Sequence, residues 1–432
     1  MKEQVYIKNT QTLSAYRLLY TLKKLGCSEI CYAPGSRSAP LVMAMSAITG
    51  FRKHIHYDER GLGWYALGIA RATRKPVIVF TTSGSAVANL YPSVLAAELY
   101  NLPLIVITAD RPDELIDCGA NQATLQDRIF GSETEFLELS ADNDICHSAG
   151  HQHLICLAFN RARTRLRPFH INISFREPLY DTEERFSDED ELKKMLTAVR
   201  NDTEKYIETM GLNRELPGIS LAEITMPTHH EKNVEPPFYV VCGNSELDER
   251  FLDYLPETEA PNYLYFTYES VIKNQIYASI VRPFGDESLR NIIIQAEHDA
   301  NSGILEGIQR LQNTRMACHN GLTAVAAGAG LKSNVLLLAD LPEILADLNS
   351  LPLIKNSGTK VMVINQHYSG NRHLAKFVPA VDIREIAEGF GLPYRRINSK
   401  NEFGKFVEEY CTTGQKWIPE IIEVSDFADE KE

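Results

Sequence analysis

The apolar positions in the first third of the chain follow two different spacings. Over residues 10–25 they recur at intervals of three and four, and Gly26 follows directly, which predicts one amphipathic helix. Residues 77–82 and 104–108 instead begin with continuous apolar runs, as strands do that are buried on both faces. Buried strands that alternate with helices predict a parallel α/β sheet.

Shorter patterns of the same two kinds predict the rest of this sheet. We expect further strands at residues 28–33, 55–57 and 170–175, and further helices at 62–72 and 86–99. Ligands on a parallel sheet bind at the carboxyl ends of its strands. The loops that follow the predicted strands are therefore the first place to look for a functional site.

The chain changes character after its first third. Residues 181–237 are mostly charged or interrupted by proline, which predicts a linker with helical pieces rather than a packed domain. A weakly patterned α/β block follows at 239–280, where Cys242-Gly243 suits either a middle-domain strand or the start of the last domain. The last block predicts strands at 335–339, 361–364 and 421–424, and helices at 341–351, 382–390 and 403–411.

The composition narrows the class of protein. With 432 residues, 44% of them hydrophobic, the chain is large enough for two or three domains with buried cores. A net charge of −13 argues against a nucleic-acid partner, which would need a basic face. The chain begins without the apolar segment of a signal peptide and has no apolar run that could cross a bilayer, so we expect a cytoplasmic protein without a membrane partner. The eight cysteines include no C-x-x-C pair, as expected for reduced thiols.

Two arginines directly follow predicted strands. Arg37 lies in the loop Gly35-Ser36-Arg37-Ser38, and Arg111 follows the strand at 104–108. A guanidinium at a strand end suits a carboxylate or phosphate, and a Gly-Ser turn offers backbone N–H groups. A solvated arginine in an ordinary turn is the alternative, and the residue pattern leaves both open.

Glu59 lies where a predicted strand gives way to a helix. As the first acidic residue of a helix it could simply complement the helix dipole. It could also be a carboxylate with a raised pKa in a partly apolar cleft, able to share a proton with a heterocyclic nitrogen. The residue pattern by itself does not decide between these two roles.

Five segments within residues 31–123 occur in an order and spacing that resemble one enzyme family. They read CYAPGSRSAPL, HYDERGLGWYALGIA, TTSGSAVANLYP, LIVITADRPDEL and CGANQA, and REPLYD at 176–181 looks like the end of the same domain. The family is that of the 2-succinyl-5-enolpyruvyl-6-hydroxy-3-cyclohexene-1-carboxylate (SEPHCHC) synthases of menaquinone biosynthesis, which use thiamine diphosphate (ThDP). The resemblance implies a ThDP-binding fold, with two parallel-sheet α/β domains joined by a reduced middle region. The pyrimidine-binding domain would comprise residues 1–182, the charged linker and reduced middle domain 183–300, and the diphosphate-binding domain 301–432.

The resemblance also implies roles for individual residues. Glu59 would hydrogen-bond the aminopyrimidine of ThDP and promote the imino tautomer that activates the thiazolium. The activated cofactor would decarboxylate 2-oxoglutarate and add the resulting succinyl-semialdehyde carbanion to isochorismate. The substrate-binding positions implied by the family are Ser36, Arg37, Arg111, Asn121, Gln122 and Arg315. Both substrates are dicarboxylates, which arginine binds through two parallel hydrogen bonds.

The same resemblance places the cofactor diphosphate on a divalent metal, Mg²⁺ or Mn²⁺, held by oxygen ligands. The implied cofactor-binding positions are Ser83, Gly84, Ala339, Asp340 and Leu341, besides Glu59, and the implied metal ligands are Asp340 and Gln366. Two of these depart from the family pattern, because Ala339 stands where glycine is usual and Gln366 where asparagine is usual. The chain is also shorter than the family pattern, mostly between residues 182 and 315.

Three functions remain open at this point. The chain is a SEPHCHC synthase with a trimmed middle domain, or a catalytically impaired relative that acts as a binding or regulatory subunit. A different ThDP-dependent lyase would account for the altered metal site, but not for the GSRS and CGANQ segments. Because the family builds its cofactor site between two subunits, we expect a homodimer or homotetramer.

Overall fold

The computed structural model shows two compact units, each built on its own sheet. The first unit comprises residues 1–218 and the second residues 219–432. Within them the structure describes residues 6–73, 75–99, 102–131, 134–141, 149–165, 167–179, 189–212, 238–242, 263–267, 321–332, 334–339, 341–364, 381–399, 401–402, 405–406 and 416–424.

The sheet of the first unit has six strands in the order β2-β1-β3-β4-β6-β5, and all neighbouring strands are parallel. Its strands are β1 (Glu29–Tyr32), β2 (Arg52–Ile55), β3 (Val77–Thr81), β4 (Leu104–Asp110), β5 (Glu135–Ser140) and β6 (Phe169–Ser174). β3 and β4 are buried along their whole length, as their apolar sequences predict. The strand order reverses between β1 and β3, so the crevice at their carboxyl ends is the switch point of the sheet.

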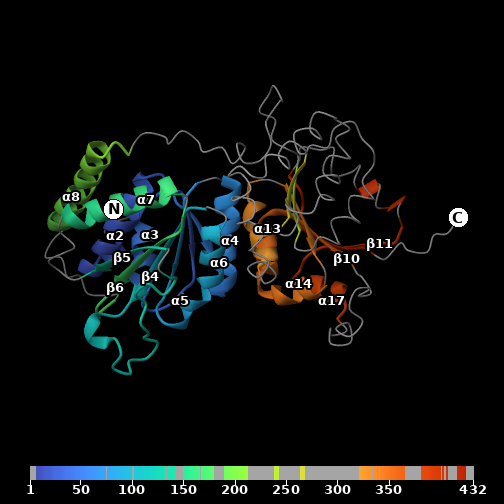
Figure 1. The fold of residues 1–432 in the computed structure, drawn as a ribbon, viewed down its shortest axis with the longest axis horizontal. Helices are drawn as coiled ribbons and strands as arrows, with labels where there is room; N and C mark the ends of the chain where they lie inside the picture. Colours follow the sequence, from blue (N-terminus) through green and yellow to red (C-terminus); the bar gives the residue numbers. More distant parts are fainter. Residues whose placement is uncertain are drawn as a thin grey trace, which may run out of the picture. The chain divides into compact units, whose positions relative to one another are not determined.

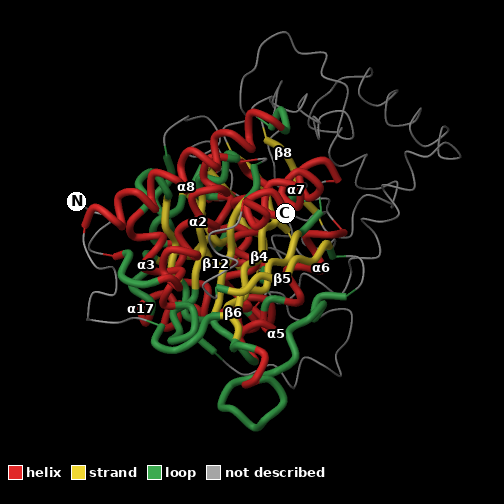
Figure 2. Tube along the Cα trace, turned by 90° about the vertical axis from the view of Figure 1, so that its left-hand side faces the viewer, coloured by secondary structure: helices red, strands yellow, loops and turns green. Residues whose placement is uncertain are grey.

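Helices cover both faces of this sheet (Figure 1). They are α2 (Thr10–Lys24), α3 (Ala39–Ala47), α4 (Glu59–Thr73), α5 (Ser85–Asn89), α6 (Tyr91–Leu99), α7 (Ala149–Arg165) and α8 (Glu189–Thr209), with the short 3-10 helix η1 (Asp113–Leu115) after β4. The helices α2, α3 and α7 form one layer, and α4 and α6 lie on the opposite face. Figure 2 views the first layer face on, with α8, α7 and α2 in front of the strands.

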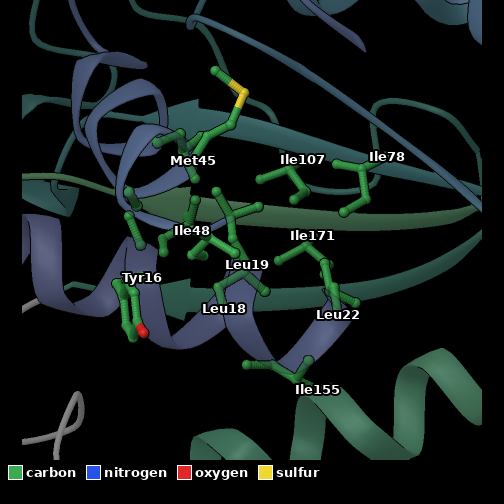
Figure 3. Close-up of a cluster of buried hydrophobic side chains, with 14 of the residues drawn as sticks. Tyr16, Leu18, Leu19, Leu22, Met45, Ile48, Ile78, Ile107, Ile155 and Ile171 are labelled. Atoms are coloured by element: carbon green, nitrogen blue, oxygen red, sulfur yellow. The ribbon is translucent and has the colours of Figure 1, made fainter. Parts of the chain in front are cut away.

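The main core of the first unit lies between the sheet and the layer of α2, α3 and α7 (Figure 3). Leucines of α2 meet isoleucines of the strands and of α7; the buried side chains include Leu18, Leu19, Leu22, Ile48, Ile78, Ile107, Ile155 and Ile171. Each such side chain stabilises the fold by about 1.5–3 kcal/mol relative to exposure to water. This core fixes the strands, and the strands in turn fix the loops at their carboxyl ends.

Helix α8 packs onto this core instead of forming part of a linker. Its Leu192, Leu196 and Val199 are buried among the residues of α2 and α7. Gln152 of α7 donates a hydrogen bond to Thr203 of α8, so the contact is polar as well as apolar. The remaining positions of α8 are largely charged and face outward, which explains why the sequence looked like a solvated linker.

The sheet of the second unit also has six parallel strands, in the order β11-β12-β10-β9-β7-β8. They are β7 (Phe238–Cys242), β8 (Tyr263–Thr267), β9 (Asn334–Ala339), β10 (Gly358–Ile364), β11 (Tyr394–Ile397) and β12 (Glu420–Val424). The described helices are α13 (Leu322–Ala329), α14 (Leu341–Ala346), η5 (Leu348–Ser350), α15 (Leu351–Ile354) and α17 (Ile383–Gly389). A buried ion pair joins Lys360 of β10 to Glu420 of β12 at 2.7 Å, so neither charge is left unpaired inside the sheet.

Strand β7 ends at Cys242, the first residue of the segment that the sequence left unassigned. It pairs with β9 from Tyr239 to Cys242, so this segment belongs to the sheet of the second unit. Both β7 and β8 come from the range 183–300, as does helix α8 of the first unit. The three-segment division of the chain remains a proposal beside the two observed units.

The two parallel sheets confirm the predicted α/β fold class. Several boundaries differ: β2 starts earlier than the strand expected at 55–57, and α5 and α6 replace the single helix expected at 86–99. Strand β11, helix α3, strand β5 and helix α7 were not predicted. Most of the helix expected at 403–411 lies outside the described residues.

Candidate functional site at the carboxyl ends of the first sheet

Three loops converge where β1, β3 and β4 end. The loops after β1 and β3 touch at Gly35, where an added Cβ would lie only 2.4 Å from Cβ of Thr82. Glycine is therefore needed for this close approach. Ser38 stabilises the first loop, since its hydroxyl donates to the Gly35 carbonyl at 3.0 Å, while Ser36 beside it is exposed. The switch point of the sheet is thus a compact edge formed by three separate segments.

Arg37 is buried at this edge and bound to the loop after β6. One terminal nitrogen, Nη1, donates to the Phe175 carbonyl at 2.8 Å, and Nη2 lies 3.1 Å from a carboxylate oxygen of Glu177. Burial lowers the pKa of Arg37, and the nearby Glu177 carboxylate partly offsets this by raising it. Its Nε is buried and has no hydrogen-bond partner within the described part of the chain. One donor of this guanidinium is therefore unused at the predicted substrate site.

Arg111 joins the turn after β3 to the loop that contains Gln122. Its Nη1 donates to the Ser83 hydroxyl at 2.5 Å and to the Gln122 carbonyl at 2.6 Å. The Ser83 hydroxyl donates to the same carbonyl, and Gln122 Nε2 donates to the Ser83 carbonyl, both at 3.1 Å. Gly84 approaches this loop so closely that an added Cβ would lie 2.8 Å from the Gln122 carbonyl oxygen. We call Ser83, Gly84, Arg111 and Gln122 the Arg111 clamp.

The Arg111 clamp brings together four of the predicted site residues. Gly84 and Gln122 both have positive φ angles, +79° and +56°, so the backbone itself is shaped to make the contact. Asn121 lies next to Gln122 and is exposed. Besides burial, the positive charge of Arg111 contributes to the lowered pKa of Arg37, and the carboxylate of Asp110 partly offsets it. The two arginines predicted from strand ends thus belong to one positively charged edge.

Glu59 is the first residue of α4, at the next strand end along the sheet. The preceding Asp58 begins the helix, since its side chain accepts hydrogen bonds from the amides of Arg60 and Gly61 at 3.0 and 3.5 Å. One carboxylate oxygen of Glu59 accepts from Asn89 Nδ2 at 3.2 Å, and the other has no hydrogen-bond partner among the described residues. Asn89 ends α5, which starts directly after Gly84, so Glu59 is linked to the segment that carries the Arg111 clamp.

His56 lies just before this helix and is buried. Burial lowers its pKa, which the carboxylates of Asp58 and Glu59 partly offset by raising it. Its Nε2 is buried without a hydrogen-bond partner in the described structure. His56 is thus a buried polar residue close enough to Asp58 and Glu59 for their charges to act on it.

Three polar residues beneath the clamp were not predicted. Asp110, Gln126 and Asn172 are all buried, and they connect to one another and to the clamp by hydrogen bonds. Burial raises the pKa of Asp110, while hydrogen bonds from Asn172 and the Arg111 amide lower it. A usable signal was present for Asn172, because its amide stands between two isoleucines in the predicted strand that became β6. Gln126 carried no such signal.

The predicted site residues of the second half are only partly described. Ala339 ends β9 and is fully buried, and Leu341 begins α14. Asp340, Gln366 and Arg315 lie outside the described residues. No group of three or more metal-binding side chains occurs within the described part of the chain. Nor does any described helix have the length and apolar character needed to span a membrane.

The comparisons with known proteins bear on the first unit most directly. Residues 14–134 match the family "Thiamine pyrophosphate enzyme, N-terminal TPP binding domain", where thiamine pyrophosphate is another name for ThDP. The matched range contains the Arg111 clamp, Arg37 and Glu59. Residues 14–134 are therefore similar in sequence to a ThDP-enzyme N-terminal domain.

Curated relatives make the resemblance more specific. Proteins named SEPHCHC synthase are 46% identical over 179 residues in Shewanella sp. strain W3-18-1 and 48% identical over 167 residues in Shewanella halifaxensis. These alignments cover 41% and 38% of this chain. The chain therefore spans about a third of the length of these relatives, 31% and 29%. The predicted resemblance to SEPHCHC synthases, as a shortened relative, is confirmed over that part.

A solved structure extends the fold comparison to the whole chain. The benzoylformate decarboxylase of Polynucleobacter necessarius matches 98% of this chain and 100% of its own, with a TM-score of 0.54 at 12% identity. At that identity the match concerns the fold alone. It supports the ThDP-enzyme fold that the two parallel sheets indicate.

Proposed function

We propose that this ThDP-enzyme relative decarboxylates 2-oxoglutarate and adds the four-carbon fragment to isochorismate, with ThDP and Mg²⁺ or Mn²⁺ as cofactors. The observation that carries the proposal is the positively charged edge: Arg37 and the Arg111 clamp lie at neighbouring strand ends, in the domain that matches the family. Two arginines suit a dicarboxylate substrate, because a guanidinium binds a carboxylate through two parallel hydrogen bonds. The relatives named SEPHCHC synthase point to the same class of substrates.

The residues of the first unit suit the pyrimidine half of the cofactor. When bound, ThDP supplies the carbanion chemistry that removes carbon dioxide from a 2-oxo acid. Glu59 has one oxygen held by Asn89 and one without a partner in the described structure, so its carboxylate can hold a proton at a heterocyclic nitrogen. Gly84 leaves room where any side chain would collide with Gln122. Ser83 and Gly84 would border the cofactor, and Ser36, Asn121 and Gln122 the substrates.

The second half of the chain carries the residues that we propose for the cofactor diphosphate and its metal. Asp340 stands in the sequence between the end of β9 and the start of α14, which is a carboxyl end of the second sheet. We propose Asp340 and Gln366 as metal ligands, Ala339 and Leu341 as cofactor neighbours, and Arg315 as a further substrate contact. Oxygen ligands of this kind suit Mg²⁺.

The role of Glu59 is tested by Glu59→Gln. We expect the variant to bind ThDP but to release carbon dioxide from 2-oxoglutarate about 10²–10⁴-fold more slowly, because the amide cannot exchange the proton. Glu208→Gln is the matched control, since Glu208 is exposed on α8. Unchanged turnover in the Glu59 variant would remove the assigned role.

One observation favours a second function. The curated alignments leave more than half of this chain unmatched, and Ala339 and Gln366 depart from the family pattern. A catalytically impaired binding or regulatory subunit would explain both. Calorimetric titration with ThDP and Mg²⁺ separates the two readings: low-micromolar binding supports an enzyme, and no heat at millimolar ThDP supports the subunit. Binding of ThDP with decarboxylation of another 2-oxo acid, but not of 2-oxoglutarate, would point to a different ThDP-dependent lyase.

We further propose that the protein self-associates as a dimer or tetramer in the cytoplasm. Large apolar side chains are exposed around β2 and α6, namely Ile55, Tyr57, Tyr91 and Leu95. A contiguous exposed patch of such side chains marks an interface, and we propose that these four residues form one. Sedimentation of a monomer at micromolar concentration would contradict this proposal.

A further inference from the structure

A relay of three buried side chains runs beneath the Arg111 clamp. Gln126 Oε1 accepts the Gly84 amide at 3.0 Å, and Gln126 Nε2 donates to Asn172 Oδ1 at 2.8 Å. Asn172 Nδ2 donates to one oxygen of Asp110 at 2.8 Å, and the other oxygen accepts the Arg111 amide at 2.7 Å. The relay therefore begins at one backbone amide of the clamp and ends at another.

The direction of every hydrogen bond in the relay is fixed by its two ends. The Gly84 amide can only donate, so Gln126 must present its oxygen there and its nitrogen to Asn172. An ionised Asp110 can only accept, so Asn172 must present its nitrogen to Asp110 and its oxygen to Gln126. Thr108 donates a further hydrogen bond to Asn172 Oδ1 at 2.7 Å. Both amide side chains are thus held in a single orientation.

Gln126 joins parts of the sheet that are not neighbours in sequence. Besides Gly84 after β3 and Asn172 on β6, its Nε2 reaches the Ala109 carbonyl of β4 at 3.4 Å. Its side chain is 1% exposed, so water does not replace these partners. A buried polar group whose partner is removed costs more than the hydrogen bond itself contributed. Gln126 therefore stabilises the spacing between the turn at Gly84 and the ends of β4 and β6.

We propose that Gln126 and Asn172 are positioning residues, which act through Gly84 and Arg111 on the edge where cofactor and dicarboxylate would bind. This inference deepens the proposed function and, for its effect on ligands, rests on it. The relay would hold the Gly84 turn against Gln122 and fix the backbone from which the Arg111 guanidinium extends. Neither residue touches the ligand.

The test compares two buried glutamines of the same domain. Gln126→Met keeps the size of the side chain and removes its hydrogen bonds to Gly84 and Asn172. Gln152→Met is the matched control: Gln152 is also fully buried and accepts from Arg17 at 2.7 Å and donates to Thr21 at 3.0 Å, but in the layer of α2, α7 and α8. The readout is hydrogen–deuterium exchange of peptides that contain the Gly84 and Arg111 amides, measured by mass spectrometry on the full chain.

We expect exchange at Gly84 and Arg111 to become about tenfold faster or more in Gln126→Met, and to stay unchanged in Gln152→Met even if that variant is less stable. Equal effects of both variants would overturn the positioning role. Exchange at Gly84 in the wild-type protein at the rate of an unstructured peptide would also overturn it, whichever variant folds.

Ligand binding supplies the second readout. Under the proposed function, Gln126→Met should raise the KM for ThDP or 2-oxoglutarate about tenfold while kcat at saturation changes less, whereas Gln152→Met changes neither. An unaltered KM beside faster Gly84 exchange would overturn the link between the relay and the site. If the wild-type protein binds no ThDP, the proposed function fails, and the exchange comparison still decides whether the relay holds the clamp.

Discussion

The buried His170, which contacts Thr108 of β4, makes the stability of the first unit depend on pH. Burial lowers its pKa to about 3, and its Nε2 lies 2.7 Å from the Thr108 hydroxyl. In the unfolded chain its pKa returns to 6.5, so between these values the unfolded state binds more protons. The loss of stability caused by His170 is therefore absent above pH 6.5. Below it, the free energy of unfolding falls by up to about 1.4 kcal/mol per pH unit as the pH drops toward 3.

We predict that His170→Gln flattens this pH dependence. The free energy of unfolding, measured in urea between pH 7.5 and 5, should fall less steeply in the variant than in the wild type. His153→Gln, on the exposed side of α7, should leave the slope as it is. Burial also lowers the pKa values of His56 and His151, so some slope remains in the variant. An identical slope in wild type and His170→Gln would contradict the prediction.

The carboxylate of Glu29 loses its stabilising effect only below its unfolded pKa of 4.5, so it adds little to the slope measured between pH 7.5 and 5. Burial raises its pKa, but hydrogen bonds from His54 and Arg52 outweigh burial and lower it to about 2. The stabilisation from this carboxylate is therefore present above its unfolded pKa of 4.5 and is lost as the pH falls toward 2.

A side chain at Gly84 would cause both backbone strain and a collision within the clamp, and a comparison with Gly119 separates the two effects. An alanine there would have a positive φ, and its Cβ would collide with Gln122; Gly119 has nearly the same φ, +80°, but nothing within 4 Å of an added Cβ. We predict that Gly119→Ala costs about 1 kcal/mol of unfolding free energy and Gly84→Ala about 1–3 kcal/mol more. Equal costs in urea unfolding would mean that the clamp relaxes around the added methyl group.

At the residue scale, the sequence predicted the charged residues of the candidate site but not the buried residues that hold them in place. Arg37, Arg111 and Glu59 could be found because charged residues directly after buried strands lie at the binding edge of a parallel sheet. Gln126 could not be found, since its partners come from β3, β4 and β6 and meet only when the sheet forms. The ion pair between Arg37 and Glu177 could not be predicted for the same reason, because the loops after β1 and β6 meet only in the folded sheet.

At the scale of elements, helix α8 decides where the first domain ends. Its buried residues are Leu192, Leu196, Val199 and Ile207, with Leu212 just beyond. Losing several such side chains, at about 1.5–3 kcal/mol each, is a large change compared with the ~5–15 kcal/mol net stability of a domain. Removing α8 would also leave Gln152 of α7 without Thr203.

We therefore predict that a fragment of residues 1–218 unfolds cooperatively and that a fragment of residues 1–182 does not. Circular dichroism during thermal unfolding measures both. Within the longer fragment, Leu196→Asp should abolish the cooperative transition, whereas Thr197→Asp on the exposed side of α8 should leave it intact. Cooperative unfolding of the 1–182 fragment would show that α8 is dispensable.

The elements that the sequence predicted well are those whose burial is uniform. β3 and β4 are buried along their whole length and were found with small shifts. β5 is only partly buried and carries glutamates, and α7 places polar residues such as Gln152 and Arg163 inside, so neither shows a clear period. The apolar residues of α8 recur at helical spacing, but its many charged residues made the segment look like a linker.

At the scale of the whole molecule, the proposed self-association depends on the apolar residues around β2 and α6. We predict that Leu95→Glu combined with Tyr57→Ser shifts the protein toward monomer in sedimentation velocity at micromolar concentration. Leu154→Glu is the control, because Leu154 is similarly exposed, 40% against 43% for Leu95, but lies on α7 in the other helix layer. A similar shift in both variants would mean that the effect is one of general stability.

The position of α8 also sets a delay during synthesis of the chain. The strands and inner helices of the first unit are complete at residue 174, but the core closes only when Leu212 has been added. At about 5–20 residues per second the ribosome needs roughly 2–8 s for that interval. Throughout it the outer faces of α2 and α7 stay open to water and to other nascent chains. During this interval of synthesis, a chaperone that binds apolar helix surfaces would be able to bind the exposed faces of α2 and α7.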